Sequence, residues 1–190
     1  MPSRQLPLQN GSFASLQKII YEKGTPVTTT GITANHRTGV TQELTLTLVN
    51  VSVPIVDAGA SGAGGGLKIY SFPRGNIKLD NFTTNLAIAK AGSNITATAA
   101  VVASLGTAAA AADATLTSTE ADVIPSTTAT LTAGAGAFKA RCTAAVFVDG
   151  TAAAKDVYLN FAIPDAGSAG NDSILVNGTI TLQWNNAGYY

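Results

Sequence analysis

The chain has few of the side chains that usually carry out chemistry. Its 190 residues include one His and one Cys, and only 12% of them are charged. Nucleophilic catalysis, general acid–base chemistry and metal binding all need several such side chains close together. The composition therefore favours a protein that acts through its surface, and we expect no enzyme activity.

The two rarest side chains stand alone in their surroundings. Cys142 has no second Cys to pair with, and it lies in the alternating segment 137–148, where a small hydrophobe suits a strand. His36 lies in the polar stretch 34–37 without a second His or any nearby Cys, so we interpret it as a surface or interface residue. We expect neither a metal nor a cofactor.

Charge and hydropathy argue against two classes of partner. The 11 basic and 11 acidic residues give a net charge of zero, and they are scattered, whereas a nucleic-acid-binding protein needs a basic stripe. The apolar runs fall far short of the roughly 20 residues that cross a bilayer. The first residues also lack the pattern of a signal peptide. We therefore expect no nucleic-acid or membrane partner, and a chain made in the cytoplasm and used without export.

Aromatic residues make up only 6% of the chain, and Ala supplies much of the apolar content. Burial of apolar surface contributes about 25 cal/mol per Å², and small side chains bury little of it. We therefore expect a light core whose stability depends partly on binding partners.

Residues 1–39 differ from the rest of the chain. They contain Pro2, Pro7 and Pro26 and show no sustained hydrophobic period, which is typical of an extended arm. Within the arm, Ser12–Glu22 places apolar side chains at helix-like spacing behind a Ser, so it is either a brief helix or a docking segment. Two Tyr residues at the C terminus offer large contact area at small entropic cost. The candidate interface residues are Phe13, Leu16, Ile19, Ile20, Tyr21, Tyr189 and Tyr190.

From Val40 the hydrophobic period becomes two, the period of a strand. Leu44, Leu46 and Leu48 alternate with Thr, and the apolar positions then move to the opposite parity from Val49 to Ile55. Such a shift predicts a bulge or a strand that passes from one sheet to another at a corner.

The remaining sequence contains further short alternating segments separated by turn residues. About eight to ten such strands predict an all-β domain over 40–190, a jelly-roll-like antiparallel β-sandwich with an extended N-terminal arm and one short helix. The exposed edges of such a sandwich need protection, which regular assembly provides. The predicted strands are 67–72, 76–79, 82–90, 94–107, 127–132, 137–148, 157–163 and 173–184.

The short helix is predicted near 118–124. Thr117–Glu120 has the spacing of a capping box, and Pro125 follows soon after. Glu120 and Asp122 are then acids in the first turn of a helix, where they complement its dipole, rather than a catalytic pair.

Four other segments are predicted to connect strands. The sequence Pro73–Gly75 favours a hairpin or a sharp corner, and Ala108–Ala112 favours a strand end and a loop. The Gly-rich stretch Gly59–Gly66 has no Lys-Ser/Thr pair to make a phosphate cradle, so we predict a flexible loop. The loop 165–172 contains two acids, but it lacks the ligand spacing of a known calcium loop.

Three segments together resemble a known group of proteins. They are Leu67–Ile77 (LKIYSFPRGNI), Ser118–Thr127 (STEADVIPST) and Lys155–Ala166 (KDVYLNFAIPDA). They resemble small head-structure proteins of tailed bacteriophages, of the decoration or cement type, which sit outside the major capsid protein. The resemblance covers roughly residues 40–185 and includes no catalytic signature. It implies a virion protein that clamps neighbouring capsid subunits, commonly as a trimer or a dimer.

We therefore expect a capsid decoration protein on the exterior of the virion. Its expected partners are the major capsid protein and further copies of itself, as a homo-oligomer with a trimer favoured over a dimer. The alternative is a carbohydrate- or receptor-binding β-sandwich module of a phage fibre or a bacterial surface protein. The candidate sugar-stacking rings for that alternative are Trp184, Tyr70, Tyr158, Tyr189 and Tyr190.

Overall fold

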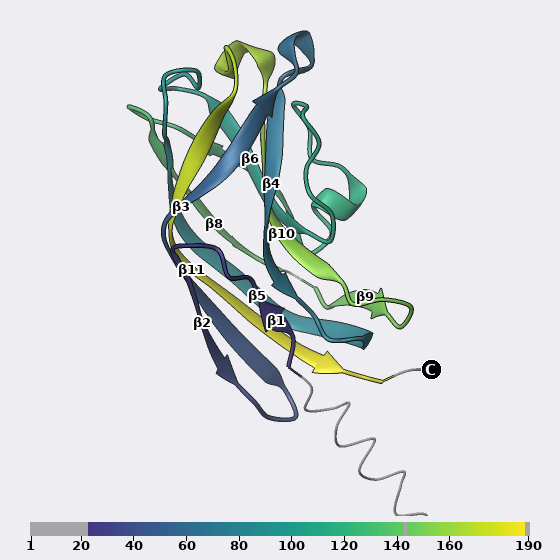
Figure 1. The fold of residues 1–190 in the computed structure, drawn as a ribbon. Coiled ribbons are helices and arrows are strands. Elements are labelled where there is room, and N and C mark those ends of the chain that lie inside the picture. Colours follow the sequence, from purple (N-terminus) through teal and green to yellow (C-terminus); the bar gives the residue numbers. More distant parts are fainter. Residues whose placement is uncertain (1–22, 143, 189–190) are drawn as a thin grey trace, which may run out of the picture.

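The computed structural model describes residues 23–142 and 144–188. Over this range almost all of the regular structure is strand, with three one-turn 3-10 helices in the connections (Figure 1). The strands are β1 (Thr25–Pro26), β2 (Ile32–Arg37), β3 (Gln42–Asp57), β4 (Ala63–Ser71), β5 (Gly75–Lys90), β6 (Ala100–Gly106), β7 (Ile124–Thr130), β8 (Ala135–Arg141), β9 (Val146–Gly150), β10 (Asp156–Ile163) and β11 (Asp172–Asn186). The 3-10 helices are η1 (Gly59–Ser61), η2 (Ser118–Glu120) and η3 (Asp165–Gly167).

The strands form two antiparallel layers. The first layer, here called sheet A, has the order β7-β6-β10-β4, and the second, sheet B, has the order β3-β11-β5-β8. Strand β3 also pairs with β4 through Val56 and Asp57, so the layers are joined at one corner. Each layer turns its apolar side chains toward the other, as a sandwich requires.

The order of pairing is that of a jelly roll, in which a long hairpin is rolled so that its strands alternate between layers. Numbered along the roll, the first strand pairs with the last (β3 with β11), the second with the seventh (β4 with β10), the third with the sixth (β5 with β8) and the fourth with the fifth (β6 with β7). The predicted all-β, jelly-roll-like sandwich is confirmed.

The N-terminal part of the chain differs from the prediction where it is described. Residues 25–37, which we assigned to the arm, contain two strands: β1 pairs with the end of β4, and β2 pairs with β3 over Leu44–Leu48 and Glu43. These strands extend one sheet each, so the paired structure begins at Thr25 rather than at residue 40.

The parity shift in β3 has the structural cause that the sequence indicated. Asn50 has a positive φ of 51°, and β11 changes register opposite it, between Val176 and Gly178. The Asn50 amide donates to Asn177 Oδ1 at 2.8 Å, which closes the irregularity. The bulge keeps Leu44–Leu48 and Val51–Ile55 facing the core although their parity differs.

One predicted boundary is wrong, for a physical reason. The segment 137–148 is two strands, because the chain leaves β5 at Cys142 and returns to it at Val146. The 16-residue length of β5 lets it pair with β8 at one end and with β9 at the other. Pro73–Gly75, predicted as a hairpin or a sharp corner, is the corner, since β4 and β5 lie in different sheets.

The Gly-rich stretch is another correction. Only Gly59–Ser61 and Gly62 form a turn, and Gly64–Gly66 belong to β4. A Cβ atom on Gly64 would lie 2.2 Å from Ala111 O, and one on Gly66 would lie 2.9 Å from Ala110 N. Glycine is needed there because the loop 107–123 packs directly on this strand.

The loop 107–123 covers the outer side of sheet A (Figure 1, right side). It includes the predicted loop Ala108–Ala112 and the predicted helix, which is the single 3-10 turn η2. Glu120 forms its half of the capping box by accepting from the Thr117 amide at 2.8 Å. Pro125 lies in β7 instead of ending a longer helix.

Candidate functional site

No segment within 23–142 or 144–188 covers the outer side of sheet B, which carries a regular array of hydroxyl and amide side chains, here called the polar face. The inward positions of its strands are Leu, Ile, Val, Phe and Trp, so Thr and Asn alternate with them on the outside. Two rows cross five strands in register. One is Asn35, Thr45, Thr181, Thr83 and Arg141, and the other is Thr33, Thr47, Thr179, Asn85 and Lys139.

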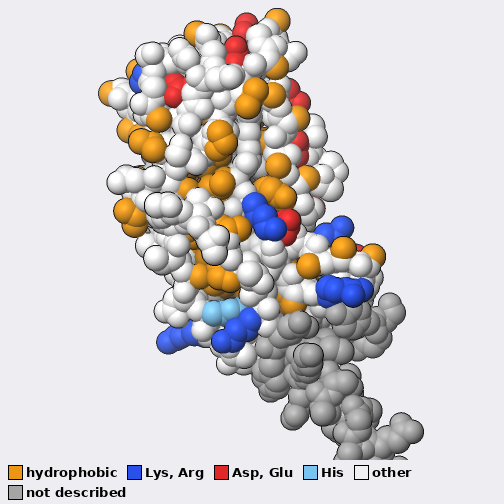
Figure 2. All heavy atoms as spheres, viewed as in Figure 1, with side chains coloured by type: hydrophobic (Ala, Val, Ile, Leu, Met, Phe, Trp, Pro, Cys, Tyr) orange, Lys and Arg blue, Asp and Glu red, His pale blue; other side chains and the backbone are white. Residues whose placement is uncertain are grey.

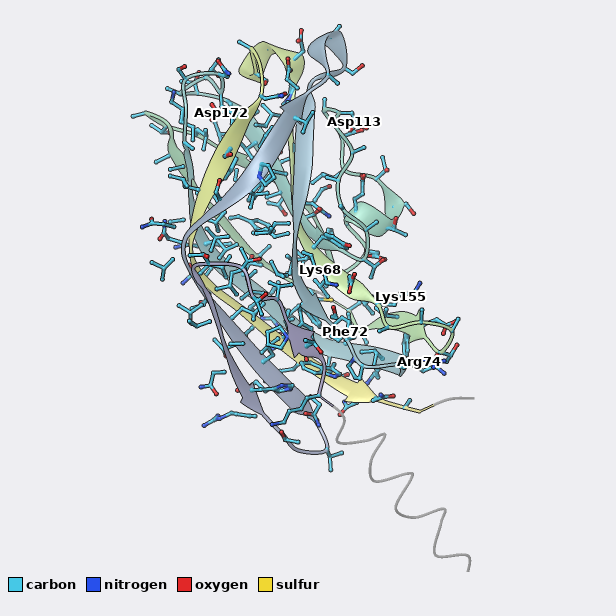
Figure 3. The ribbon with its side chains drawn as sticks, in the orientation of Figure 1. Lys68, Phe72, Arg74, Asp113, Lys155 and Asp172 are labelled. Carbon is cyan, nitrogen blue, oxygen red and sulfur yellow. The ribbon has the colours of Figure 1, made fainter. Side chains whose placement is uncertain are left out.

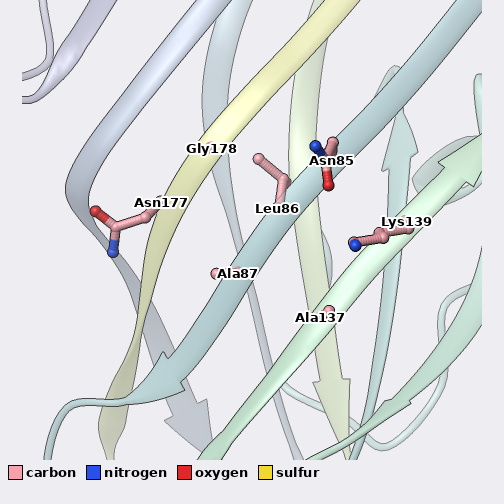
Figure 4. A pocket seen from close by; sticks show the side chains of 7 residues that line it. All are labelled: Asn85, Leu86, Ala87, Ala137, Lys139, Asn177 and Gly178. Carbon is pink, nitrogen blue, oxygen red and sulfur yellow. The ribbon is translucent and has the colours of Figure 1, made fainter.

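A groove of about 430 Å³ lies on the polar face where β11, β5 and β8 run side by side. Figure 4 shows Asn177 and Lys139 on either side of β5, with Ala87 and Ala137 between them. The lining residues are Asn85, Leu86, Ala87, Ala137, Lys139, Asn177 and Gly178. The groove therefore has a floor of small side chains and polar groups on its walls.

Only one polar side-chain atom of the groove, Asn177 Oδ1, forms a hydrogen bond with another described residue. Asn177 Oδ1 accepts from the Asn50 amide at 2.8 Å, which leaves the Asn177 NH₂ group available. Neither Asn85 nor Lys139 uses its side chain in a hydrogen bond or an ion pair with any residue of 23–142 or 144–188. Arg141, two positions from Lys139 on the same face, forms no ion pair in that range either.

An aromatic cluster fills the end of the sandwich where β1, β9 and the C-terminal end of β11 lie. The Trp184 ring lies 5.3 Å from His36, 5.5 Å from Tyr70 and 5.5 Å from Phe72, measured between ring centroids. These residues come from β11, β2 and the end of β4. The cluster joins both sheets to the segment that enters at Lys23, so it fixes the position from which residues 1–22 leave.

Burial controls the protonation of two members of the cluster. Burial raises the pKa of Tyr70 far above its ordinary value, and the nearby backbone of Gly24 only partly offsets this. Burial, together with the nearby charge of Lys23, lowers the pKa of His36. Both rings are therefore neutral at pH 7, and His36 is a half-buried packing residue on β2 rather than a free surface residue.

On the face drawn in Figure 2, acidic side chains lie mainly toward one end of the sandwich and basic side chains mainly toward the other, and Figure 3 labels examples of each. Asp113 and Asp172 lie at one end, and Arg74 and Lys155 lie at the end with the aromatic cluster. At the latter end Lys68 pairs with Asp156 at 2.8 Å, and Ser71 donates to the same carboxylate at 2.6 Å. Burial would raise the pKa of Asp156, but the hydrogen bonds from Lys68 and Ser71 outweigh it, and the pKa is lowered.

Asp172, in the loop considered for calcium, has a structural role. Its carboxylate accepts from the amides of Gly92, Asn94, Ile95 and Ser173 at 2.7 to 3.0 Å. Burial acts to raise the pKa of Asp172, but these four donors outweigh it and lower the pKa. The carboxylate ties the loop after β5 to the start of β11. In the described part of the chain, no three His, Cys, Asp or Glu side chains are placed to share a metal ion.

The seven predicted interface residues lie outside the described part of the chain. Phe13, Leu16, Ile19, Ile20 and Tyr21 precede Lys23, and Tyr189 and Tyr190 follow Gly188. Their role as an interface stays a prediction. Cys142 is a buried free thiol, consistent with its interpretation as a small hydrophobe.

Three of the five rings considered for sugar stacking are described, and two of these three are fully buried. Trp184 and Tyr70 are both 0% exposed and belong to the core, so neither can stack on a ligand. Tyr158 is half-buried on β10. Phe147 on β9, which sequence analysis did not single out, is instead 74% exposed.

Sequence analysis also missed the residues of the groove. The alternation of Thr45 and Thr47 with buried Leu was visible, as was that of Thr179 and Thr181 with Ile180 and Leu182. Their alignment across strands depends on pairing between residues more than 100 positions apart, such as Thr45 with Thr181. No local pattern contains that register.

The chain matches no protein-family model, no curated protein and no solved structure. No helix within 23–142 or 144–188 has the length and apolar character needed to cross a membrane. Function must therefore be argued from the surfaces themselves.

Proposed function

We propose that this chain is a capsid decoration protein of a tailed bacteriophage. It binds the outside of the shell built by the major capsid protein, and it stabilises the shell by bridging neighbouring subunits as a homo-oligomer, with a trimer favoured over a dimer. The virion exterior is then its site of action. Its role is structural rather than catalytic.

The difference between the two outer faces carries this proposal. Sheet A is covered by the chain's own loop 107–123, whereas sheet B presents five strands of Thr and Asn with no covering segment among the described residues. A protein that acts by contact needs one broad, rigid and uncovered surface. A sheet face provides it, because its side chains are held by the strands on both sides.

Two further features support the proposal. Jelly rolls occur in viral capsid proteins and also in lectins, so the fold agrees with the proposal without selecting it. The resemblance to phage decoration proteins favours a capsid protein over a lectin. Two of its three segments, 67–77 and 155–166, contain the paired strands β4 and β10.

The expected mechanism is multivalent. Each copy adds a modest interface, and bridging of several shell subunits raises the effective concentration of every further contact. The N-terminal segment leaves from the aromatic end at Lys23 and carries the apolar residues Phe13 to Tyr21. Residues 1–22 extended at about 3.3–3.6 Å per residue would reach roughly 75 Å, enough to reach a neighbouring subunit.

The test uses purified full-length chain and expanded phage capsids that lack it. We expect saturable binding at a fixed copy number and a higher temperature of capsid rupture. Failure to bind, or binding without any gain in heat resistance, contradicts the proposal.

A matched pair of variants tests which face is used. Thr181→Arg places a bulky cation on the polar face, and Thr119→Arg places the same group on the loop that covers sheet A. We expect Thr181→Arg to abolish capsid binding and Thr119→Arg to leave it unchanged. The reverse pattern would show that the shell is bound by the covered side.

A further inference from the structure

The groove on the polar face has the composition of a ligand site. Its unused groups are the Asn85 amide, the NH₂ group of Asn177 and the ammonium of Lys139, with the Arg141 guanidinium nearby. Apart from the Asn85 carbonyl, all of these are hydrogen-bond donors. A ligand that matches them must be rich in acceptor oxygens.

The charge of the groove limits the chemical class of its ligand further. No acidic side chain lines it, and Lys139 and Arg141 form no ion pair with any described residue. Residues two apart on one strand are separated by roughly 6.6 Å, so the two cations reach the same part of a ligand. The site therefore favours at least one carboxylate or similar anion.

The floor of the groove suits a compact ring. Ala87 and Ala137 contribute methyl groups, and Gly178 contributes bare backbone, since a Cβ there would lie 2.1 Å from Asn85 O. A floor without branched side chains lets the C–H face of a sugar ring approach closely. The Asn85 amide lies on β5 beside this floor, and the Asn177 side chain projects from β11 on the side away from β5, where its Oδ1 accepts from Asn50, so its NH₂ group lies at the rim of the groove (Figure 4).

We propose that this groove binds a carboxylate-bearing glycan, with Lys139 and Arg141 on the carboxylate and with Asn85 and Asn177 on the hydroxyl groups. An acidic peptide fits less well, because the backbone groups of β11 and β5, which form most of the groove, are already paired on both sides and offer a peptide backbone few partners. A nucleic acid fits less well too, because no aromatic ring lines the groove for stacking.

The test is a titration of the isotope-labelled full-length chain by NMR at low ionic strength, with pentagalacturonic acid as the probe. We expect saturable shifts of the Asn85 and Asn177 side-chain amides and of the Ala87 and Ala137 backbone amides. Maltopentaose, which has hydroxyl groups and no carboxylates, should bind at least about fivefold more weakly, since exposed ion pairs contribute up to ~1 kcal/mol. Hexaglutamate should not produce the same shifts.

Two variants and a control locate the site. Lys139→Gln and Asn85→Ala should each weaken binding by about three- to fivefold, because each removes one interaction of about 1 kcal/mol or less. Lys155→Gln removes the same charge from an exposed residue at the end with β9 and should leave the affinity unchanged. All three positions are exposed, so the spectra of the variants should show an intact fold.

Several outcomes would overturn the proposal. These are the absence of saturable shifts, equal affinity for maltopentaose, tighter binding of hexaglutamate, or equal weakening by Lys155→Gln. Capsid binding is measured separately with the same variants. Absence of glycan binding by a wild-type chain that binds capsids would remove this inference alone, and glycan binding by a wild-type chain that does not bind capsids would remove the proposed function alone.

Discussion

The outer faces of the two sheets differ although one chain and one period of alternation produce both. On sheet A the outward side chain of Asn160 is 0% exposed, because the loop 107–123 lies over it. On sheet B the outward side chain of Asn85 is exposed in the groove. An Asn side chain thus holds a covering loop in place on sheet A, whereas an Asn side chain on sheet B has no hydrogen bond within the described residues and is available to a partner.

The hydrogen bonds of Asn160 show how the covering works. Its Nδ2 donates to Ala108 O at 2.9 Å and to Glu120 O at 2.8 Å, and its Oδ1 accepts from the Ala110 amide at 3.0 Å. Asp122 holds the start of the same loop by accepting from the amide and hydroxyl of Thr107. A face covered in this way has satisfied its polar groups internally, so the bare face is the one available to partners.

The largest effect that we expect from this difference is that of Asn160→Ala. The substitution removes three hydrogen bonds from a fully buried side chain and leaves the Ala108 carbonyl and the Ala110 amide without that partner, while Glu120 O keeps its bond from the Ser104 hydroxyl. The free energy of unfolding should therefore fall by about 3 kcal/mol or more. Asn85→Ala, the matched change on the polar face, should cost less than about 0.5 kcal/mol. Urea denaturation of both variants measures the difference. Equal losses of unfolding free energy in the two variants would mean that the Asn160 side chain does not hold the loop 107–123 in place.

Gly64→Ala should have the next largest effect. Its Cβ would lie 2.2 Å from Ala111 O and 2.8 Å from Asp113 O, which are backbone atoms that cannot rotate away. We expect a loss of about 2 kcal/mol and faster amide exchange throughout 107–117, because the loop must lift from sheet A. Ala137→Val adds two methyl groups to the polar face and should leave exchange in that loop unchanged. If the amides of residues 107–117 stayed protected from exchange in Gly64→Ala, the loop would not depend on close contact with Gly64.

The third prediction concerns a polar side chain that holds a loop in place at one end of the sandwich. Asp172→Asn should lower the free energy of unfolding by about 1–2 kcal/mol at pH 7, because an amide cannot accept all four donors as a carboxylate does.

The pH dependence of that loss has a defined sign. The pKa of Asp172 is lower in the folded chain than in the unfolded chain, so its contribution is complete above the ordinary Asp value of about 3.9. The contribution is lost as the pH falls through the lowered folded value. The stabilities of the two proteins should therefore converge below about pH 4, and a constant difference down to pH 2 would contradict this role.

The smallest effect belongs to the polar face. Thr45→Val with Thr181→Val changes two residues that lie directly opposite each other on β3 and β11. Val keeps the β-branched shape that suits a strand, so stability should stay within about 0.5 kcal/mol of the wild type. Capsid binding should nevertheless weaken, since two hydroxyl groups are lost from the contact surface. A large loss of stability would show that these hydroxyl groups serve the fold.

The sequence predicted the strands whose two faces differ in exposure. β3, β5 and β11 each bury one side, so alternation located them, and the parity change near Asn50 located the bulge. Prediction failed for the start of β4, where residues 63–65 are buried on both faces and no alternation remains. Gly64 and Gly66 were interpreted as flexible, although the loop above them requires glycine for close approach.

Prediction of the candidate site was weaker than prediction of the fold. The composition indicated a contact protein, but it directed attention to aromatic rings, and Trp184 and Tyr70 are core residues. The groove depends on the neighbouring positions of β11, β5 and β8, which are brought together only by the rolled topology. Lys139 and Asn85 are 54 positions apart in sequence but directly opposite in the sheet.

The central place of β11 in sheet B has a consequence for synthesis of the protein. β11 is the last strand made, yet it lies between β3 and β5. Until residues 172–186 leave the ribosome, β3 and β5 each have an unfilled edge, and the aromatic end lacks Trp184. Non-local pairing of this kind folds slowly and exposes strand edges in the meantime. The nascent chain therefore passes through a stage in which its future binding face is an open gap, and only complete chains can present that face.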